Sequence, residues 1–239
     1  MSKAVLVSVL VVAVVACSKD SSDLTTDNIG AQYIVTLNDD PTAPSQNTTM
    51  EAYLDDATVG GTQDKVDLTG SDALVVTTDK NDNVNLPHES LGHYLATIPN
   101  VDRTSFTFQL KRSAGASSSP VTLPDHLALT DSPDGKSIAA SGMVHFAWSN
   151  QAKGGKLTLH ASHHVCSGVT LSNDSVDLPF DDTGTLDVAV SSLGGVAPAS
   201  GECIDIAIQR AVTSNADAAL AYGSSVTSKR TDRYKITVQ

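Results

Sequence analysis

The residues with the clearest chemical potential are histidines in the second half of the chain. His160, His163 and His164 lie close together, and His145 precedes them in a separate alternating segment. If these two segments pair as a β-hairpin across 149–156, His145 falls directly opposite His160 on the outer face. Two facing imidazoles can share a zinc or copper ion, and His163 would add a third ligand. The spacing therefore predicts a candidate metal site at His145, His160 and His163, with exposed histidines on a sheet face as the alternative.

A polar run offers a weaker metal pattern. The segment 79–83, Asp-Lys-Asn-Asp-Asn, places oxygen ligands at alternate positions, as calcium loops do. Val84 stands where such a loop needs glycine, and Ser90 stands where it needs glutamate. A polar turn between strands explains the run better.

Signatures of catalysis are missing from the sequence. It has no Gly-x-Ser-x-Gly elbow, no His-Glu-x-x-His helix and no phosphate-binding or dinucleotide-binding glycine loop. We therefore expect a non-enzyme that needs no cofactor, and a hydrolase built from distant loops is the least favoured alternative. Tyr33, Tyr53 or Tyr222 could stack on sugars if exposed, but a few tyrosines are more often sheet-packing or edge residues.

The elements that must position these residues are short strands. Phe106, Phe108 and Leu110 share one face of a segment whose other face is polar, which is the period of a half-buried strand. Similar alternation recurs along the chain, with Gly, Pro, Asn and Asp between the segments. This pattern predicts an all-β protein of two tandem antiparallel β-sandwich domains, at 32–124 and 125–239. One larger continuous sandwich is the alternative.

The N-terminal region differs from the rest of the chain. Lys3 precedes an apolar run from Ala4 to Ala16. As a helix this run would rise only about 20 Å, short of the roughly 30 Å hydrocarbon core of a bilayer. Residues 1–16 are therefore interpreted as an export signal. Residues 17–31 are polar and aperiodic, which predicts a flexible tether.

The end of the signal carries a family resemblance. Val14-Val15-Ala16-Cys17 resembles the lipobox of bacterial lipoproteins, although leucine is commoner than valine at the position of Val14. The resemblance implies cleavage before Cys17, a diacylglycerol on its thiol and a further acyl chain, such as palmitate, on its amine. It also implies outer-membrane sorting in a diderm source, because Ser18 is not aspartate.

Two further cysteines, Cys166 and Cys203, remain once Cys17 is lipidated. An exported chain meets an oxidising compartment, so we expect these two to form a disulfide worth about 3–4 kcal/mol. Cys203 has the opposite parity to Ile204, so the disulfide should lie at a strand end or on an outer face. The second half loosely resembles an immunoglobulin-like domain with one inward tryptophan, Trp148. In antibodies that tryptophan lies between the two cysteines, whereas Trp148 precedes both.

Charge narrows the range of partners. The formal net charge is −12, and no basic stripe is visible, so nucleic acid is not an expected partner. Contact with a membrane is expected through the acyl chains rather than through charge. The resulting expectation is a lipid-anchored envelope protein that binds a protein or glycan through loops or a strand edge. A metal-binding envelope protein is the alternative.

Overall fold

The computed structural model describes residues 18–38, 47–58, 64–99, 102–113, 115–151, 155–166, 175–194 and 196–239. Within these ranges the chain forms β-strands and short 3-10 turns, and no α-helix. No helix in the same ranges is long and apolar enough to cross a membrane. The predicted all-β class is confirmed.

The first lobe is a two-layer sandwich with its own core. Its strands are β1 (Ser18–Asp20), β2 (Ile29–Asn38), β3 (Asn47–Asp56), β4 (Lys65–Asp67), β5 (Ala73–Thr78), β6 (Asn83–Asn85), β7 (His88–Ser90), β8 (His93–Pro99), β9 (Ser105–Lys111) and β10 (Ser117–Thr122). A four-stranded sheet in the order β10-β9-β5-β6 packs against part of an 11-stranded sheet that contains β2 and β3. Tyr33 and Phe108 stack at the centre, with ring centroids 4.8 Å apart. The alternation along β9 is confirmed, because Phe106, Phe108 and Leu110 are all buried.

The second lobe repeats this arrangement. Its strands are β11 (Leu129–Asp131), β12 (Ser137–Ile138), β13 (Met143–Trp148), β14 (Lys156–Val165), β15 (Ser175–Asp181) and β16 (Thr185–Ala189), followed by the 3-10 turn η3 (Val190–Ser192). A three-stranded sheet in the order β11-β13-β16 covers the part of the 11-stranded sheet formed by β14 and β15 with the two strands that follow η3. Phe146, Trp148 and Leu159 lie in this second core. The predicted β-sandwich fold is confirmed, with two separate cores that share one sheet.

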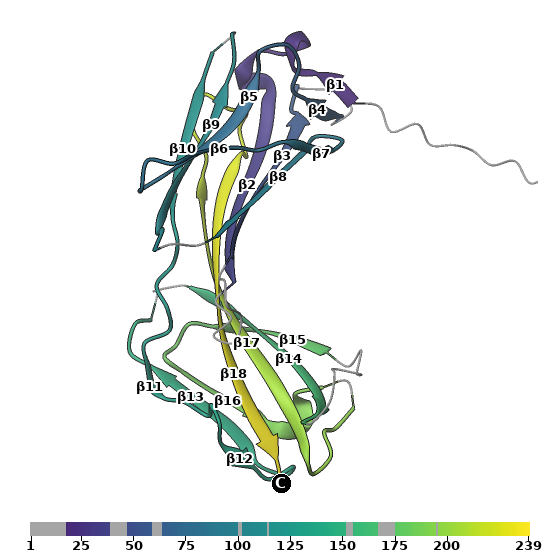
Figure 1. Cartoon of the computed structure of the whole chain (residues 1–239), viewed down its shortest axis with the longest axis vertical. Coiled ribbons are helices and arrows are strands. Elements are labelled where there is room, and N and C mark those ends of the chain that lie inside the picture. The colour runs from purple at the N-terminus through teal and green to yellow at the C-terminus, as the bar shows by residue number, and fades with distance from the viewer. Residues whose placement is uncertain are drawn as a thin grey trace, which may run out of the picture.

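Two long strands run through both lobes. They are β17 (Glu202–Asn215) and β18 (Ser225–Val238), which pair with each other along almost their whole length. In the second lobe β17 also pairs with β14, and in the first lobe β18 pairs in parallel with β2. One continuous sheet thus joins the lobes, and the molecule is a crescent (Figure 1).

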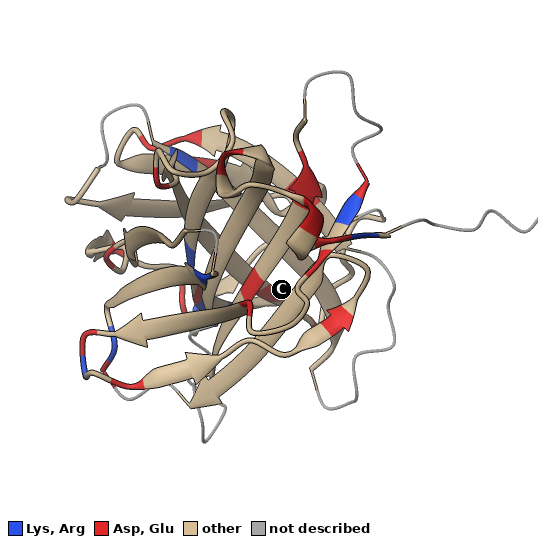
Figure 2. Ribbon diagram, turned by 90° about the horizontal axis from the view of Figure 1, so that it is seen from above, with Lys and Arg blue, Asp and Glu red and all other residues tan. Residues whose placement is uncertain are grey.

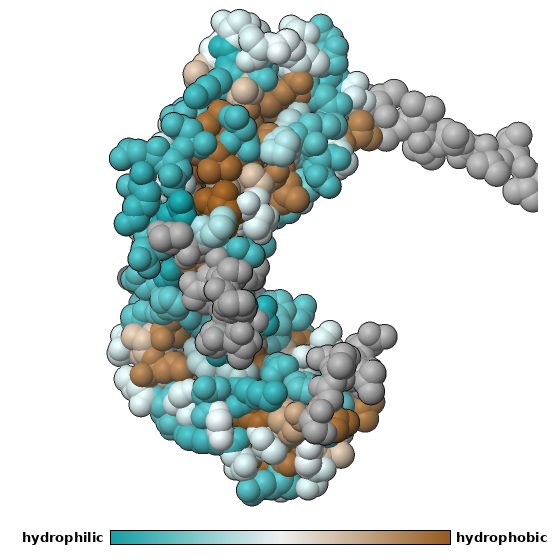
Figure 3. Space-filling model, viewed as in Figure 1, coloured by the Kyte–Doolittle hydropathy of each residue, from teal (hydrophilic) through white to brown (hydrophobic). Residues whose placement is uncertain are grey.

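Both small sheets cover the same face of this continuous sheet. Val226 lies in the first core, and Ile236 and Val238 lie in the second. Successive side chains of a strand point to opposite faces, so residues of equal parity share a face. In the described part of the chain, no strand covers the opposite face, which lines the concave side of the crescent (Figures 1 and 3).

Hydrogen bonds fix the junction between the lobes. The Ser228 hydroxyl donates to the carbonyl of Thr122 at 2.8 Å, and the Asp232 carboxylate accepts from the backbone N–H of Leu127 at 3.0 Å. The guanidinium of Arg210, buried in the second lobe, donates to the carbonyl of Asp125. These contacts tie the chain that connects the lobes to the shared strands.

The expected flexible tether at 17–31 is wrong for residues 18–31. They form β1, the 3-10 turns η1 (Ser21–Asp23) and η2 (Thr26–Asn28), and the start of β2. The cause is a buried arginine, because Arg112 donates to the carbonyls of Ser21 and Leu24 and pairs with Asp72 at 2.9 Å. Burial raises the pKa of Asp72, but hydrogen bonds from Arg112 and Ser21 outweigh it and hold that pKa below its usual value. Residues 18–31 are polar, yet they are ordered, because they are held by hydrogen bonds to polar groups such as Arg112 and Asp72.

The residues of the two cores fall within the expected domain ranges, 32–124 and 125–239, except before residue 32 and at the tip of the β17–β18 hairpin. Residues Leu24 to Leu123 belong to the first core, and residues Leu127 to Val238 supply the second. Leu220 and Val226, however, pack in the first core. The tip of the β17–β18 hairpin therefore completes the first lobe, and the chain crosses the junction three times.

Candidate functional site

The concave face of the continuous sheet is not covered by any strand in the described ranges, and it spans both lobes. Its outward side chains come from β14, β17, β18, β2 and β3, and we call this surface the open face. It comprises Thr158, His160, Ser162, Asp205, Ala207, Gln209, Lys229, Thr231, Arg233, Lys235, Gln32, Ile34, Thr36, Thr49, Glu51 and Tyr53, of which Ala207 and Thr231 are buried. Hydroxyl and amide groups dominate it, so it can donate and accept hydrogen bonds over both lobes.

Some of the basic side chains on the open face have acidic partners, and others have none among the described residues. Lys156 at its edge pairs with Asp181, and Lys235 lies 4.0 Å from Asp205. Among the described residues no carboxylate lies within ion-pair distance of Lys229 or Arg233. Their neighbours in register are alanine and threonine, so within the described ranges these two cations of the shared sheet lack an acidic partner.

An aromatic pair lies on the open face of the first lobe. The rings of Tyr53 and His93 stack at a centroid distance of 4.5 Å and an angle of 4°. Glu51 accepts from the Tyr53 hydroxyl at 3.5 Å and lies 3.6 Å from His93. Burial and the charge of Glu51 raise the pKa of Tyr53. Tyr33 is fully buried, so it cannot stack on a sugar.

The predicted histidine site at His145, His160 and His163 does not form. β13 and β14 belong to different sheets, so the expected hairpin across 149–156 is wrong. His145 instead faces Asp187 on β16, with Nδ1 and Oδ1 2.7 Å apart. His160 faces Asp177 on β15, at 2.5 Å. The two strands follow one another in sequence, but a sandwich places them in opposite layers.

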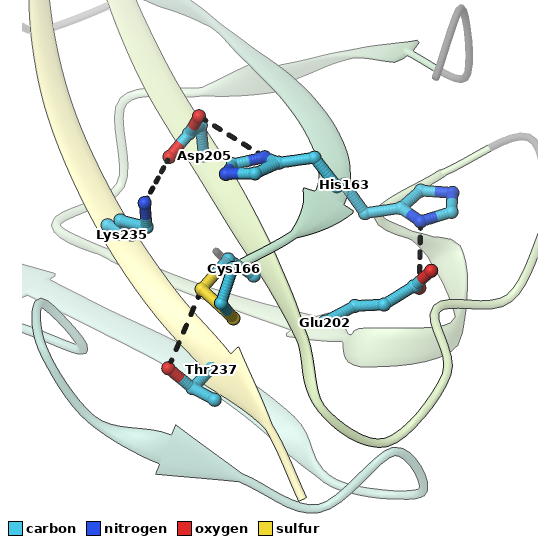
Figure 4. Close-up of a disulfide and its surroundings, with 8 residues drawn as sticks. His163, Cys166, Glu202, Asp205, Lys235 and Thr237 are labelled. Atoms are coloured by element: carbon cyan, nitrogen blue, oxygen red, sulfur yellow. Dashed lines mark hydrogen bonds and ion pairs between the residues drawn. A yellow bond between two sulfur atoms is a disulfide. The ribbon is translucent and has the colours of Figure 1, made fainter. Parts of the chain in front are cut away.

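His163 lies near the disulfide (Figure 4), and His164 is directly opposite Cys203 in the pairing of β14 with β17. His163 points inward, and its Nδ1 lies 2.9 Å from Glu202. A backbone hydrogen bond from Ala199 lowers the pKa of Glu202; burial opposes this, and His163 adds to the lowering. The ring of His163 packs on Gly194, where an added Cβ would lie 2.7 Å from Cδ2. This histidine is therefore part of the packing of the lobe.

Carboxylates accompany all the histidines of the chain. The remaining pairs are His88–Asp67 at 3.0 Å, His126–Asp232 at 2.6 Å and His164–Asp205 at 3.5 Å. Sequence reasoning missed these partners because most come from other strands, brought alongside only by pairing. The pairs are spread over separate sheets and both lobes, so they do not converge on one site. In the described ranges no three His, Cys, Asp or Glu side chains are grouped to hold a metal ion.

The polar run at 79–83 is a turn whose carboxylates are engaged. Asp79 accepts from the backbone and hydroxyl of Thr104 at 3.0 and 2.9 Å. Asp82 accepts from Arg103 at 2.6 and 2.8 Å. Asn81 has a φ of 63°, the left-handed conformation that asparagine tolerates in turns. The interpretation as a polar turn accounts for the run.

The predicted disulfide is present. Cys166 and Cys203 are bonded, with Cα atoms 4.9 Å apart. Cys166 follows the end of β14, and Cys203 is directed to the same side of the sheet as Asp205. The disulfide therefore lies at a strand end and on the face opposite to Ile204, as the alternation of β17 predicted. Cys17, the predicted lipidation site, lies outside the described residues.

Asp182 and Arg210 form a deeply buried ion pair in the second lobe, and this pair has a structural role. The indole N–H of Trp148 donates to Asp182 at 2.6 Å, and Arg210 lies 3.0 Å from the same carboxylate. Arg210 also donates to the carbonyl of Asn150 at 2.9 Å. These bonds offset much of the cost of burying the two charges, although Nε of Arg210 has no hydrogen-bond partner among the described residues.

Two hollows flank the tip of the β17–β18 hairpin. One, of about 450 Å³, is lined by residues 215–218 and 220–224. The other, of about 230 Å³, lies between the hairpin tip and Gly30, Asp55 and Asp56. Tyr222 borders both and is fully exposed.

Comparisons with known proteins do not identify a family for this chain. No protein-family model matches the chain, and no curated protein matches it. A solved structure described as Dpr11 IG1 bound to DIP-gamma IG+IG2 is similar over 88% of this chain and 96% of that chain, with 8% identity and a TM-score of 0.25. So low a score does not define a shared topology, so the fold assignment rests on the sheets and cores described above.

Proposed function

We propose that this chain is an exported lipoprotein, anchored through Cys17, that serves as a non-catalytic binding module of the cell envelope. It is held in the outer membrane if the source is a diderm bacterium. The open face is its contact surface, and its partner is an envelope protein or a glycan. This replaces the loops and strand edges that the sequence favoured with a sheet face.

One observation carries the binding role. A single sheet spans two lobes, has both covering sheets on one side and leaves the concave side without a described strand. Because hydrogen bonds at the junction hold the lobes together, the face is preorganised, which lowers the entropic cost of binding. The dispersed histidine–carboxylate pairs support a non-catalytic role.

The charges of the open face indicate which partners fit. Lys229 and Arg233 have no described carboxylate partner, whereas the rest of the chain is acidic. Complementary charge steers association and weakens with salt. A partner that places acidic groups opposite these two residues is therefore favoured, and its binding should fall as salt rises.

A matched pair of glutamines allows a direct test. Gln209 lies on the open face in β17, and Gln109 lies on the back of the four-stranded sheet in β9; both are half-buried in central strands. A photo-reactive amino acid that inserts into C–H bonds would replace each in turn, in cells that make the full chain. We expect a defined adduct from position 209 and none from position 109. Equal adducts from both positions, or an adduct from 109 alone, would show that the open face is not the contact surface.

A further inference from the structure

Tyr222 has an unusual position for an aromatic residue. Its side chain is completely exposed, on the turn between β17 and β18. The turn is firmly held, because Ala221 donates its N–H to the carbonyl of Ile29 at 3.0 Å and Ser224 accepts from the N–H of Ala31 at 3.0 Å. Leu220 anchors it in the first core. Tyr222 therefore projects from a rigid support.

The first described residues, Ser18–Asp20, lie at the same end of the molecule. The smaller hollow beside Tyr222 is also lined by Asp56, and Lys19 pairs with Asp56 at 2.8 Å. Lys19 lies in β1, which begins at Ser18, directly after Cys17. Consecutive Cα atoms are about 3.8 Å apart, so a lipidated Cys17 would have no spacer. The first lobe must then rest against the bilayer with the end that carries Tyr222.

We propose that Tyr222 and the surrounding end of the first lobe contact the headgroup layer of the membrane that holds the acyl chains of Cys17. This inference rests on the proposed lipid anchor. Tyrosine suits such a site because its ring is apolar and its hydroxyl can stay hydrated at the headgroup level. The acyl chains hold the protein on the membrane, and the contact of Tyr222 determines the orientation of the first lobe relative to the bilayer. The second lobe, with the disulfide and the C-terminus, lies at the opposite end of the crescent (Figure 1) and would therefore point away from the bilayer.

Charge defines which lipid surface fits. Asp20, Asp23 and Asp27 are exposed near the start of the described chain and outnumber Lys19 and Lys65, and the view onto this end shows both acidic and basic residues there (Figure 2). Carboxylates at the surface repel anionic headgroups over about one Debye length, roughly 8 Å at physiological salt. Close contact of Tyr222 is therefore expected on zwitterionic vesicles and should weaken on anionic vesicles at low salt.

The test uses the lipidated full chain on phosphatidylethanolamine–phosphatidylcholine vesicles. The chain has one tryptophan, Trp148, which is buried in the second lobe and supplies a constant background. Tyr222→Trp adds a reporter at the hairpin tip. Met143→Trp adds a matched reporter at the far end, where Met143 is half-exposed near the C-terminus. Each variant is read with and without brominated lipid, a short-range quencher.

We expect the emission added by Tyr222→Trp to shift to the blue on vesicles and to be quenched by brominated lipid. The emission added by Met143→Trp should do neither. If vesicle-bound Tyr222→Trp is unquenched, the membrane contact is refuted while the lipid anchor stands. If wild-type protein carries no acyl label and does not float with vesicles, the anchor fails, and the membrane contact fails with it.

Discussion

Substitution of Arg112 tests whether residues 18–31 belong to the folded body. The Arg112 side chain is 1% exposed, and its partner Asp72 is 6% exposed. Arg112→Met leaves the Asp72 carboxylate buried without its cation and frees the carbonyls of Ser21 and Leu24. Breaking a buried pair by removing one partner costs about 3–5 kcal/mol. The double variant Arg112→Met/Asp72→Asn removes the stranded charge, so its loss should be smaller than the sum of the two single losses.

The assay is urea unfolding together with amide hydrogen exchange. In wild type we expect protection at Leu24 and through the start of β2, because these residues are buried. Arg112→Met should lose this protection and unfold at lower urea. Lys111→Met is the matched control, since Lys111 is exposed at the end of β9 and should change stability by less than about 0.5 kcal/mol. Wild-type residues 24–31 that exchange as fast as an unfolded chain would refute the reasoning.

Three further predictions follow from single sites. Replacing Cys166 and Cys203 by serine should cost about 4 kcal/mol in the chain-entropy model, because they are 37 positions apart; coincident urea midpoints for wild type and variant would contradict this. Hydrogen bonds from Lys19 and Thr58 lower the pKa of Asp56 to about 2, from 3.8 when unfolded. Its stabilisation is therefore complete above about pH 4 and lost as the pH falls toward 2, a loss that Asp56→Asn should not show in urea melts. Gly92→Ala should lower the melting temperature, because Gly92 has a φ of +63° and a Cβ there would lie 2.6 Å from the carbonyl oxygen of Leu54.

The sequence predicted the fold wherever one face of a strand is buried. Phe106, Phe108 and Leu110 alternate because the polar side chains between them face away from the core. The same parity placed Cys203 away from Ile204 and Ile206, and the disulfide follows it. The β-sandwich fold was also predictable, since short strands with turn residues between them recur along the chain.

The features that could not be predicted depend on contacts between residues far apart in the sequence. The hairpin of β13 and β14 was inferred from sequence proximity, but Trp148 and Leu157 enter the core from opposite layers. The polar segment after Cys17 resembled a tether because its stabilising partner, Arg112, lies far along the sequence. The shared strands were equally hidden: the alternation of Ile204 to Ile208 gives no sign that β17 continues into the other lobe.

The central claim, a folded module held to a membrane by Cys17, is tested most directly by acyl-chain labelling of wild type and Cys17→Ala with envelope fractionation. We predict that wild type incorporates the label and sediments with the envelope, whereas Cys17→Ala does neither. A mutant that keeps both the label and its membrane retention would contradict the account.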